Sequence, residues 1–338
     1  MYDLAVLIAV NRFILAFSGG IILLIILFLT DLVVGPTDIS LQNILLVLIN
    51  QENDPVLRGI IMDIRLPKAL TALLAGGGLS LGGLLTQTLF KNPLAGPDVL
   101  GLSAGASLAV ALIVLGGIGG SWTIAGAATL GAAVVFLIVI SVSRRISNNS
   151  SLLIVGLMIG ALTSSIVGIL QYLSQADSLK IYTLWTMGNI SSTNAGELWI
   201  MFLLIIIGTI VSLSSIKTLN AWALGERYNL SMGFNPTSFR WKVLLATCLI
   251  TGCITAFCGP ISFIGIAVPH MVKRIFPTNS HQQLIPLTLV GGGALLLSCD
   301  LLTLLPPGGT ILPINATTAL FGAPVIIWII IRSKKEFY

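Results

Sequence analysis

The sequence predicts an all-α, polytopic membrane protein with about ten transmembrane helices, formed as a single domain over residues 1–338. Three observations predict this fold class. Of the 338 residues, 56% are hydrophobic and only 9% are charged, whereas a soluble domain carries about 25% charged residues. The mean hydropathy is +1.02. Apolar runs of about 20 residues, the length that crosses a hydrocarbon core, recur along the chain. This composition excludes a soluble enzyme, a disordered chain and a nucleic-acid-binding module.

The expected spans follow the apolar runs in order. Uninterrupted runs predict spans at 13–30, 69–90, 99–118, 122–142, 152–173 and 198–216. Two later runs, 243–272 and 301–331, are too long for one helix and contain Gly259-Pro260 and Pro306-Pro307, respectively. Proline removes a backbone donor and clashes with the preceding turn, so each run should divide there. The first division leaves a short helix at about 262–276, and another span is expected at 284–299.

The basic residues predict the orientation of these spans, because cytoplasmic loops are enriched in Lys and Arg. With the N-terminus placed inside, thirteen of the 17 basic residues fall in cytoplasmic segments. The other four are Arg58, Arg65, Lys68 and Lys180. We therefore expect both termini to lie in the cytoplasm.

The sequence contains no motif for an energy source or a catalytic centre. It has no phosphate-binding GxxxxGK[ST] loop, and the expected spans hold almost no ionisable group that could relay protons or sodium. Asp300 falls at the end of a span, and the four cysteines lack metal-binding spacing. We expect a protein that is not an enzyme and has no cofactor or resident metal. If it drives transport, another subunit should supply the energy.

Two motifs flank the second span. Arg65 and Lys68 precede it on the outside, against the positive-inside bias, which indicates either an acidic partner or side chains that snorkel to the interface. The turn Asn92-Pro93-Leu94 follows the span on the cytoplasmic side. On its own, this turn is typical of any loop between helices.

The longest cytoplasmic loop, residues 217–242, has helical periodicity. Side chains that could form one face lie three or four residues apart, at Leu219, Trp222, Ala223, Arg227 and Leu230. This spacing, with Gly225 as a break, predicts two short amphipathic helices outside the bilayer. An exposed apolar face there requires a protein partner or the lipid surface, and we favour a partner.

Four motifs together carry a family resemblance. They are RLPK at 65–68, QTLFKNPLAGPDVLGLSAGAS at 87–107, LNAWALGE at 219–226 and GPISFIGIAVPHMVKR at 259–274. In this order they resemble the permeases of ABC importers for iron-siderophores, haem and cobalamin. The resemblance covers about residues 60–330.

The resemblance implies a type II ABC importer permease in a bacterial or archaeal inner membrane. The partners it implies are ABC ATPase subunits, an extracytoplasmic substrate-binding protein and a second permease copy, which forms a homodimer or a pair of related permeases. The substrate would be an iron-siderophore, haem or cobalamin, moved by alternating access.

The resemblance also implies site residues. Arg65 and Lys68 match the basic pair on which the binding protein docks, and Leu224, Gly225 and Glu226 match the loop that inserts into the ATPase. Asn92, Pro93 and Leu94 match a cytoplasmic gate, whose other half would include Asn149 and Ser150.

Three positions depart from the family pattern. Leu304 stands where an arginine often follows Asp300, Ile311 where a glutamate is common, and Asn229 replaces a usual alanine in the coupling loop. These departures bear most on the docking of the binding protein. Two alternatives stay open at this point: an ion-coupled secondary transporter, and a membrane scaffold that only anchors soluble partners.

Overall fold

The structure is a computed structural model, and it describes residues 2–37, 39–51, 54–116, 121–145, 149–306 and 310–333. The side chains of 2–10, 121–122, 149–150, 227, 329–330 and 332–333 lie outside the description. Every regular element in the described ranges is a helix. This confirms the all-α prediction.

Seven helices in the described part of the chain are long and apolar enough to cross a membrane. They are α1 (Tyr2–Val33), α4 (Leu66–Phe90), α6 (Ser121–Ser143), α7 (Asn149–Leu173), α9 (Ala195–Ser214), α12 (Pro236–Cys258) and α14 (His281–Thr303). Three further helices complete the predicted set: α5 (Leu102–Val114), α13 (Ile264–Ile275) and α15 (Ile314–Ser333). Each predicted span therefore corresponds to a helix.

Several span boundaries differ from the prediction: α1 begins at Tyr2 rather than at residue 13, and α12 begins at Pro236 rather than at residue 243. The third span was expected at 99–118, but a 3₁₀ turn, η2 (Pro97–Leu100), precedes α5. Gly101 separates the two with a φ of +76°, a left-handed conformation that interrupts helical hydrogen bonding. The end of α14 reaches Thr303 rather than 299. The break at Gly259 is confirmed, since Gly259 has a φ of +71° and α13 begins at Ile264.

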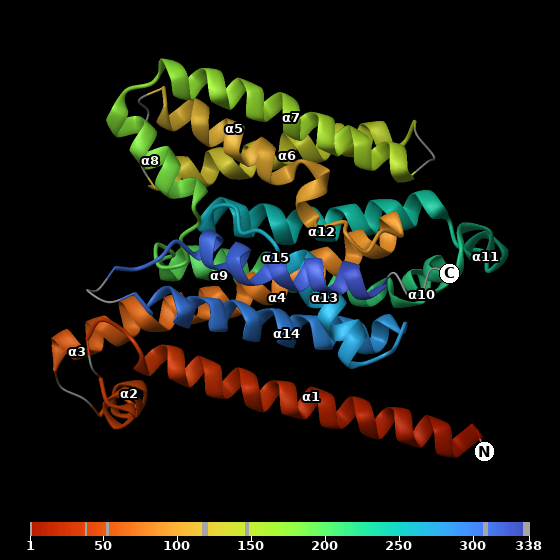
Figure 1. The fold of residues 1–338 in the computed structure, drawn as a ribbon, viewed down its shortest axis with the longest axis horizontal. Helices are drawn as coiled ribbons and strands as arrows, with labels where there is room; N and C mark the ends of the chain where they lie inside the picture. Colours follow the sequence, from red (N-terminus) through yellow and green to blue (C-terminus); the bar gives the residue numbers. More distant parts are fainter. Residues whose placement is uncertain are drawn as a thin grey trace.

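Short helices connect the spans. At one end of the bundle lie α2 (Leu41–Leu48), α3 (Pro55–Gly59), a π-helical segment η1 (Ile60–Arg65) and α8 (Ala176–Thr186). At the opposite end lie α10 (Ile216–Leu224) and α11 (Glu226–Ser231), as Figure 1 shows. The start of α1 and the end of α15 lie at this second end, which we call the α10–α11 end.

The helix α4 forms the centre of the bundle and packs against α14, α12, α13 and α9. Glycine residues allow α4 to approach two of these helices closely. A Cβ at Gly76 would collide with the Gly292 carbonyl of α14, and a Cβ at Gly83 would collide with Gly265 of α13. Small residues that let backbones approach are typical of helix contacts in membranes. On either side of this centre, α5 to α8 form one layer, and α1 lies along α14 (Figure 1).

Candidate functional site: the α10–α11 unit and the adjoining turn

The 217–242 loop contains two short helices, α10 and α11, as its periodicity predicted. Gly225 joins them with φ +137° and ψ 151°, a conformation that is essentially restricted to glycine. The loop ends at Asn235 rather than at the predicted residue 242, because the Asn235 side chain caps α12 by accepting hydrogen bonds from the backbone N–H groups of Thr237 and Ser238. We call α10 and α11 together the α10–α11 unit.

The junction of the two helices presents an apolar surface. Leu224 is 70% exposed, and Tyr228, Leu230 and Met232 are also exposed. Glu226 lies beside them, with its carboxylate 3.4 Å from the Arg240 guanidinium. The predicted residues Leu224, Gly225 and Glu226 thus lie together at the tip of the unit. Exposed apolar side chains on a loop outside the spans are typical of a surface that binds another protein.

Trp222 anchors the unit to the bundle. It is fully buried, and its indole N–H donates to the Leu89 carbonyl of α4 at 3.2 Å. Its ring packs against Phe239 of α12 with a centroid distance of 4.7 Å. The Lys91 ammonium and the Arg240 guanidinium each lie 5.7 Å from the ring centroid, within cation–π range.

A second contact joins the same elements through His281, the first residue of α14. The two ring nitrogens of His281 lie 2.8 Å from Asn220 Oδ1 of α10 and 2.8 Å from Thr88 Oγ1 of α4. The His281 backbone N–H also donates to Asn220 at 2.8 Å. One buried imidazole therefore joins α10, α4 and α14.

The turn Asn92-Pro93-Leu94 begins immediately beyond these anchors. Lys91 ends α4 with a φ of +48°. The Asn92 side chain then accepts the Leu94 N–H at 3.0 Å, and the Asn92 carbonyl accepts the Ala95 N–H at 3.1 Å. Pro93 and Leu94 are exposed. A displacement of α10 would therefore reach this turn through only a few residues of α4.

For the other half of the predicted gate, Asn149 and Ser150, the structure describes the backbone alone. Asn149 and Ser150 are the first residues of α7, but their side chains lie outside the described residues. Their approach to the Asn92-Pro93-Leu94 turn stays a prediction.

Arg65 and Lys68 lie at the opposite end of α4 and are bound within the chain. Arg65 is 7% exposed; its guanidinium donates to the carbonyls of Leu32 and Val33 at 2.7 Å each, and to Thr37. The Lys68 ammonium lies 2.7 Å from a carboxylate oxygen of Asp300. The sequence left open an acidic partner or snorkelling for these cations, and the family resemblance implied a docking role, whereas their observed partners are internal. Docking through them stays a prediction.

Asp31 was missed by the sequence analysis, which ended the first span at residue 30. It is 5% exposed and lies beside Asp300, close to Lys68 and Arg65. We call Asp31, Arg65, Lys68 and Asp300 the charge cluster. It joins the ends of α1, α4 and α14 with two acidic and two basic side chains. Nothing in the sequence pattern links Asp31 to residues so distant along the chain.

The described residues include no group of three or more His, Cys, Asp or Glu side chains placed to hold a metal ion. The described residues thus form a bundle of mostly apolar helices with an exposed, anchored pair of short helices at one end.

The chain belongs to the FecCD transport family, whose family model matches residues 23–332. It is similar to the vitamin B12 import system permease protein BtuC of Klebsiella pneumoniae, with 35% identity over 276 residues that cover 81% of this chain and 83% of that protein. It is also similar to the hemin transport system permease protein HmuU of Yersinia pestis, with 32% identity over 324 residues, 94% of this chain and 95% of that protein.

A solved structure has the same fold over nearly the whole chain. It is described as an inward-facing conformation of a metal-chelate type ABC transporter, and it superposes with a TM-score of 0.84 at 27% identity. The match covers 94% of this chain and 98% of that one. The family resemblance and the fold class predicted from the sequence are confirmed: the protein is a membrane permease of the ABC importer type.

Proposed function

We propose that this permease passes an iron-siderophore, haem or cobalamin into the cytoplasm, using work done by separate ABC ATPase subunits. The relatives named for vitamin B12 and hemin import support this substrate class. The observation that carries the proposal is the contact of the α10–α11 unit with the end of α4, through Trp222 and Leu89. This contact provides a short mechanical connection from an exposed protein-binding tip to the Asn92-Pro93-Leu94 turn.

In this proposal the α10–α11 end faces the cytoplasm of a bacterial or archaeal cell, and both termini lie there too. The charge distribution supports this orientation, since eleven of the 15 basic residues in the described ranges belong to that side and only four to the other.

The proposed mechanism is alternating access. Closure of the paired ATPase subunits on ATP moves Leu224, Gly225 and Glu226, and with them α10. The Trp222–Leu89 contact and the His281 contacts carry this movement to α4. The gate of Asn92, Pro93 and Leu94, with Asn149 and Ser150 opposite, then opens or closes a path on the axis shared with a second permease copy. Each nucleotide state of the ATPase subunits binds one of the two permease conformations more tightly and so favours that conformation.

A substrate-binding protein would deliver the ligand at the opposite end, and Arg65 and Lys68 are its proposed docking residues. Because both are bound internally, docking requires acidic groups of the binding protein to compete with Asp300 for Lys68 and with backbone carbonyls for Arg65. Leu304, which replaces a common arginine of the family, leaves Lys68 as the cation that pairs with Asp300.

Reversing the charge of Glu226 tests the ATPase contact. In Glu226→Arg we expect co-purification of the ATPase subunit that accompanies the wild-type chain to fall about tenfold, a loss of roughly 1.4 kcal/mol in binding. Asp177→Arg is the matched control, because it makes the same charge change at an exposed site at the opposite end. Equal co-purification in the two variants, each eluting as a folded protein in gel filtration, would remove Glu226 from the contact.

The substrate class is tested with the complete importer in proteoliposomes. ATP hydrolysis should rise when the binding protein is loaded with one of haem, cobalamin or a ferric siderophore. A complex that hydrolyses ATP at the same rate with all of these and with none would contradict chelate import.

A further inference from the structure

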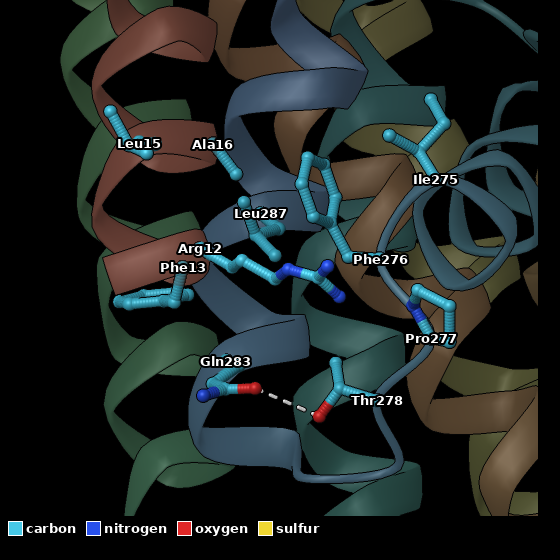
Figure 2. Close-up of a pocket in the computed structure, with 10 residues that line it drawn as sticks. All are labelled: Arg12, Phe13, Leu15, Ala16, Ile275, Phe276, Pro277, Thr278, Gln283 and Leu287. Carbon is cyan, nitrogen blue, oxygen red and sulfur yellow. Dashed lines mark hydrogen bonds between the residues drawn. The ribbon is translucent and has the colours of Figure 1, made fainter. Parts of the chain in front are cut away.

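A cavity of about 800 Å³ is lined by no residue of the α10–α11 unit, of the Asn92-Pro93-Leu94 turn or of the charge cluster, and the proposed function gives it no role. It is bounded by the part of α1 from Arg12 to Ala16, the start of α14 and the segment that joins α13 to α14 (Figure 2). We call this cavity the α1–α14 cleft. Ten residues line it: Arg12, Phe13, Leu15, Ala16, Ile275, Phe276, Pro277, Thr278, Gln283 and Leu287.

The lining of the cleft is amphipathic. Phe13, Ala16, Leu287 and Phe276 form the apolar part of the lining, and Ala16 and Leu287 lie between α1 and α14 in Figure 2. The Arg12 side chain extends from α1 toward Phe276 and Pro277, and Gln283 and Thr278 line the cleft below it in the view of Figure 2, hydrogen-bonded to each other. Such a surface suits a ligand with one apolar part and one polar head.

The polar groups of the cleft are donors. Within the described residues, the Arg12 guanidinium has no hydrogen-bond or ion-pair partner. The Thr278 hydroxyl donates to Gln283 Oε1 at 2.8 Å, which turns the amide nitrogen of Gln283 away from Thr278. A guanidinium and an amide N–H₂ offer several hydrogens to an oxyanion, and arginine's planar fork can form two parallel hydrogen bonds with a phosphate group.

The position of the cleft matches the boundary between hydrocarbon and water. Arg12 is at the first turn of the apolar segment Asn11–Val33, and Leu15, one turn further on, is 71% exposed on the outer surface of the bundle. Lys273 and Arg274 end α13 immediately before the cleft segment and add positive charge at the same level. Basic pockets between membrane helices at this level bind anionic lipid headgroups.

We propose that the α1–α14 cleft binds an anionic phospholipid. Its phosphate would lie against Arg12 and Gln283, and an acyl chain would lie along Phe13, Ala16 and Leu287. The lipid would fill the space between α1 and the rest of the bundle and so hold α1 against α14. The inference depends only on the protein's being in a membrane, and it can hold or fail independently of the transported substrate.

Native mass spectrometry of the full chain tests the site. The protein is released from nanodiscs that contain equal amounts of phosphatidylglycerol and phosphatidylcholine, and the lipids that stay bound are counted. The wild type should retain phosphatidylglycerol over phosphatidylcholine. Arg12→Gln should lower that retention at least fivefold, because a single cation near the surface contributes about 1 kcal/mol toward an anionic lipid.

Arg145→Gln is the matched control, since Arg145 is exposed at the same end of the bundle and does not line the cleft. It should retain phosphatidylglycerol as the wild type does. Equal losses in the two variants would overturn the proposal in favour of general attraction to the bilayer surface. Equal retention of the two lipids by the wild type would overturn it as well.

A second variant fills the apolar part of the cleft. Ala16→Trp should lower phosphatidylglycerol retention, whereas Ile22→Trp, which places the same ring on a lipid-exposed position of α1 outside the cleft, should not. Millimolar inorganic phosphate should leave the bound lipid in place. Its displacement by phosphate would assign the site to a free anion and contradict the lipid proposal.

Discussion

At the residue scale, the charge cluster explains why Arg65 and Lys68 depart from the positive-inside bias. Asp300 is 2% exposed and Lys68 is 15% exposed, and the cation lies 2.7 Å from the carboxylate. A charge buried in this way is costly without its partner. The two basic residues therefore stabilise the meeting point of α1, α4 and α14, whatever further role they have in docking.

Removing one member of the Lys68–Asp300 pair should destabilise the fold. We expect Lys68→Met to lower the free energy of unfolding by about 3 kcal/mol, because Asp300 is left buried without its cation. The double variant Lys68→Met with Asp300→Asn should recover part of this loss. Thermal unfolding in detergent measures both.

Lys180→Met is the control for this cycle, because Lys180 is an exposed lysine at the same end of the bundle. Its effect should stay within about 0.5 kcal/mol. If Lys68→Met and Lys180→Met were equally stable, the pair would contribute nothing to the fold, and an exposed docking role for Lys68 would gain support.

At the element scale, the sequence predicted the α10–α11 unit but not its anchors. Helical spacing with a glycine break was enough to place two short helices. The partners of Trp222 and His281 are Leu89, Thr88 and Asn220, which lie far away in sequence, and no periodicity indicates such pairs. The short helices α2 and α8 were missed because, at 8 and 11 residues, they are shorter than the apolar runs of about 20 residues from which spans were predicted.

Gly225 sets the angle between the two helices of this unit. In Gly225→Ala the backbone is strained by about 1–3 kcal/mol, because φ +137° is a glycine conformation. A Cβ would meet nothing within 4 Å, so no clash contributes. We expect the α10–α11 angle to change, and substrate uptake per ATP hydrolysed to fall several-fold in proteoliposomes.

Gly126→Ala is the matched control for this glycine. Gly126 lies on α6, where a Cβ also meets nothing within 4 Å and the backbone is helical. The Gly126→Ala permease should take up as much substrate per ATP hydrolysed as the wild type does. A Gly225→Ala permease that couples as well as Gly126→Ala would show that the junction does not transmit movement.

At the scale of the whole molecule, the bundle has two different ends joined by α4. One end holds the charge cluster, and the other holds the α10–α11 unit and the Asn92-Pro93-Leu94 turn. The fold class, the order of the spans and the division at Gly259 could all be predicted from composition and apolar runs. The contact surfaces could not, because Gly76 and Gly292, or Lys68 and Asp300, are brought together only by helix packing.

The central claim is that this permease takes its energy through the α10–α11 end from a nucleotide-hydrolysing partner. Uptake of labelled substrate into proteoliposomes tests it most directly, with the permease, the ATPase and the binding protein each omitted in turn. We predict accumulation only when all three are present with ATP, and none when a proton or sodium gradient replaces ATP. Accumulation by the permease alone, driven by either gradient, would contradict the claim.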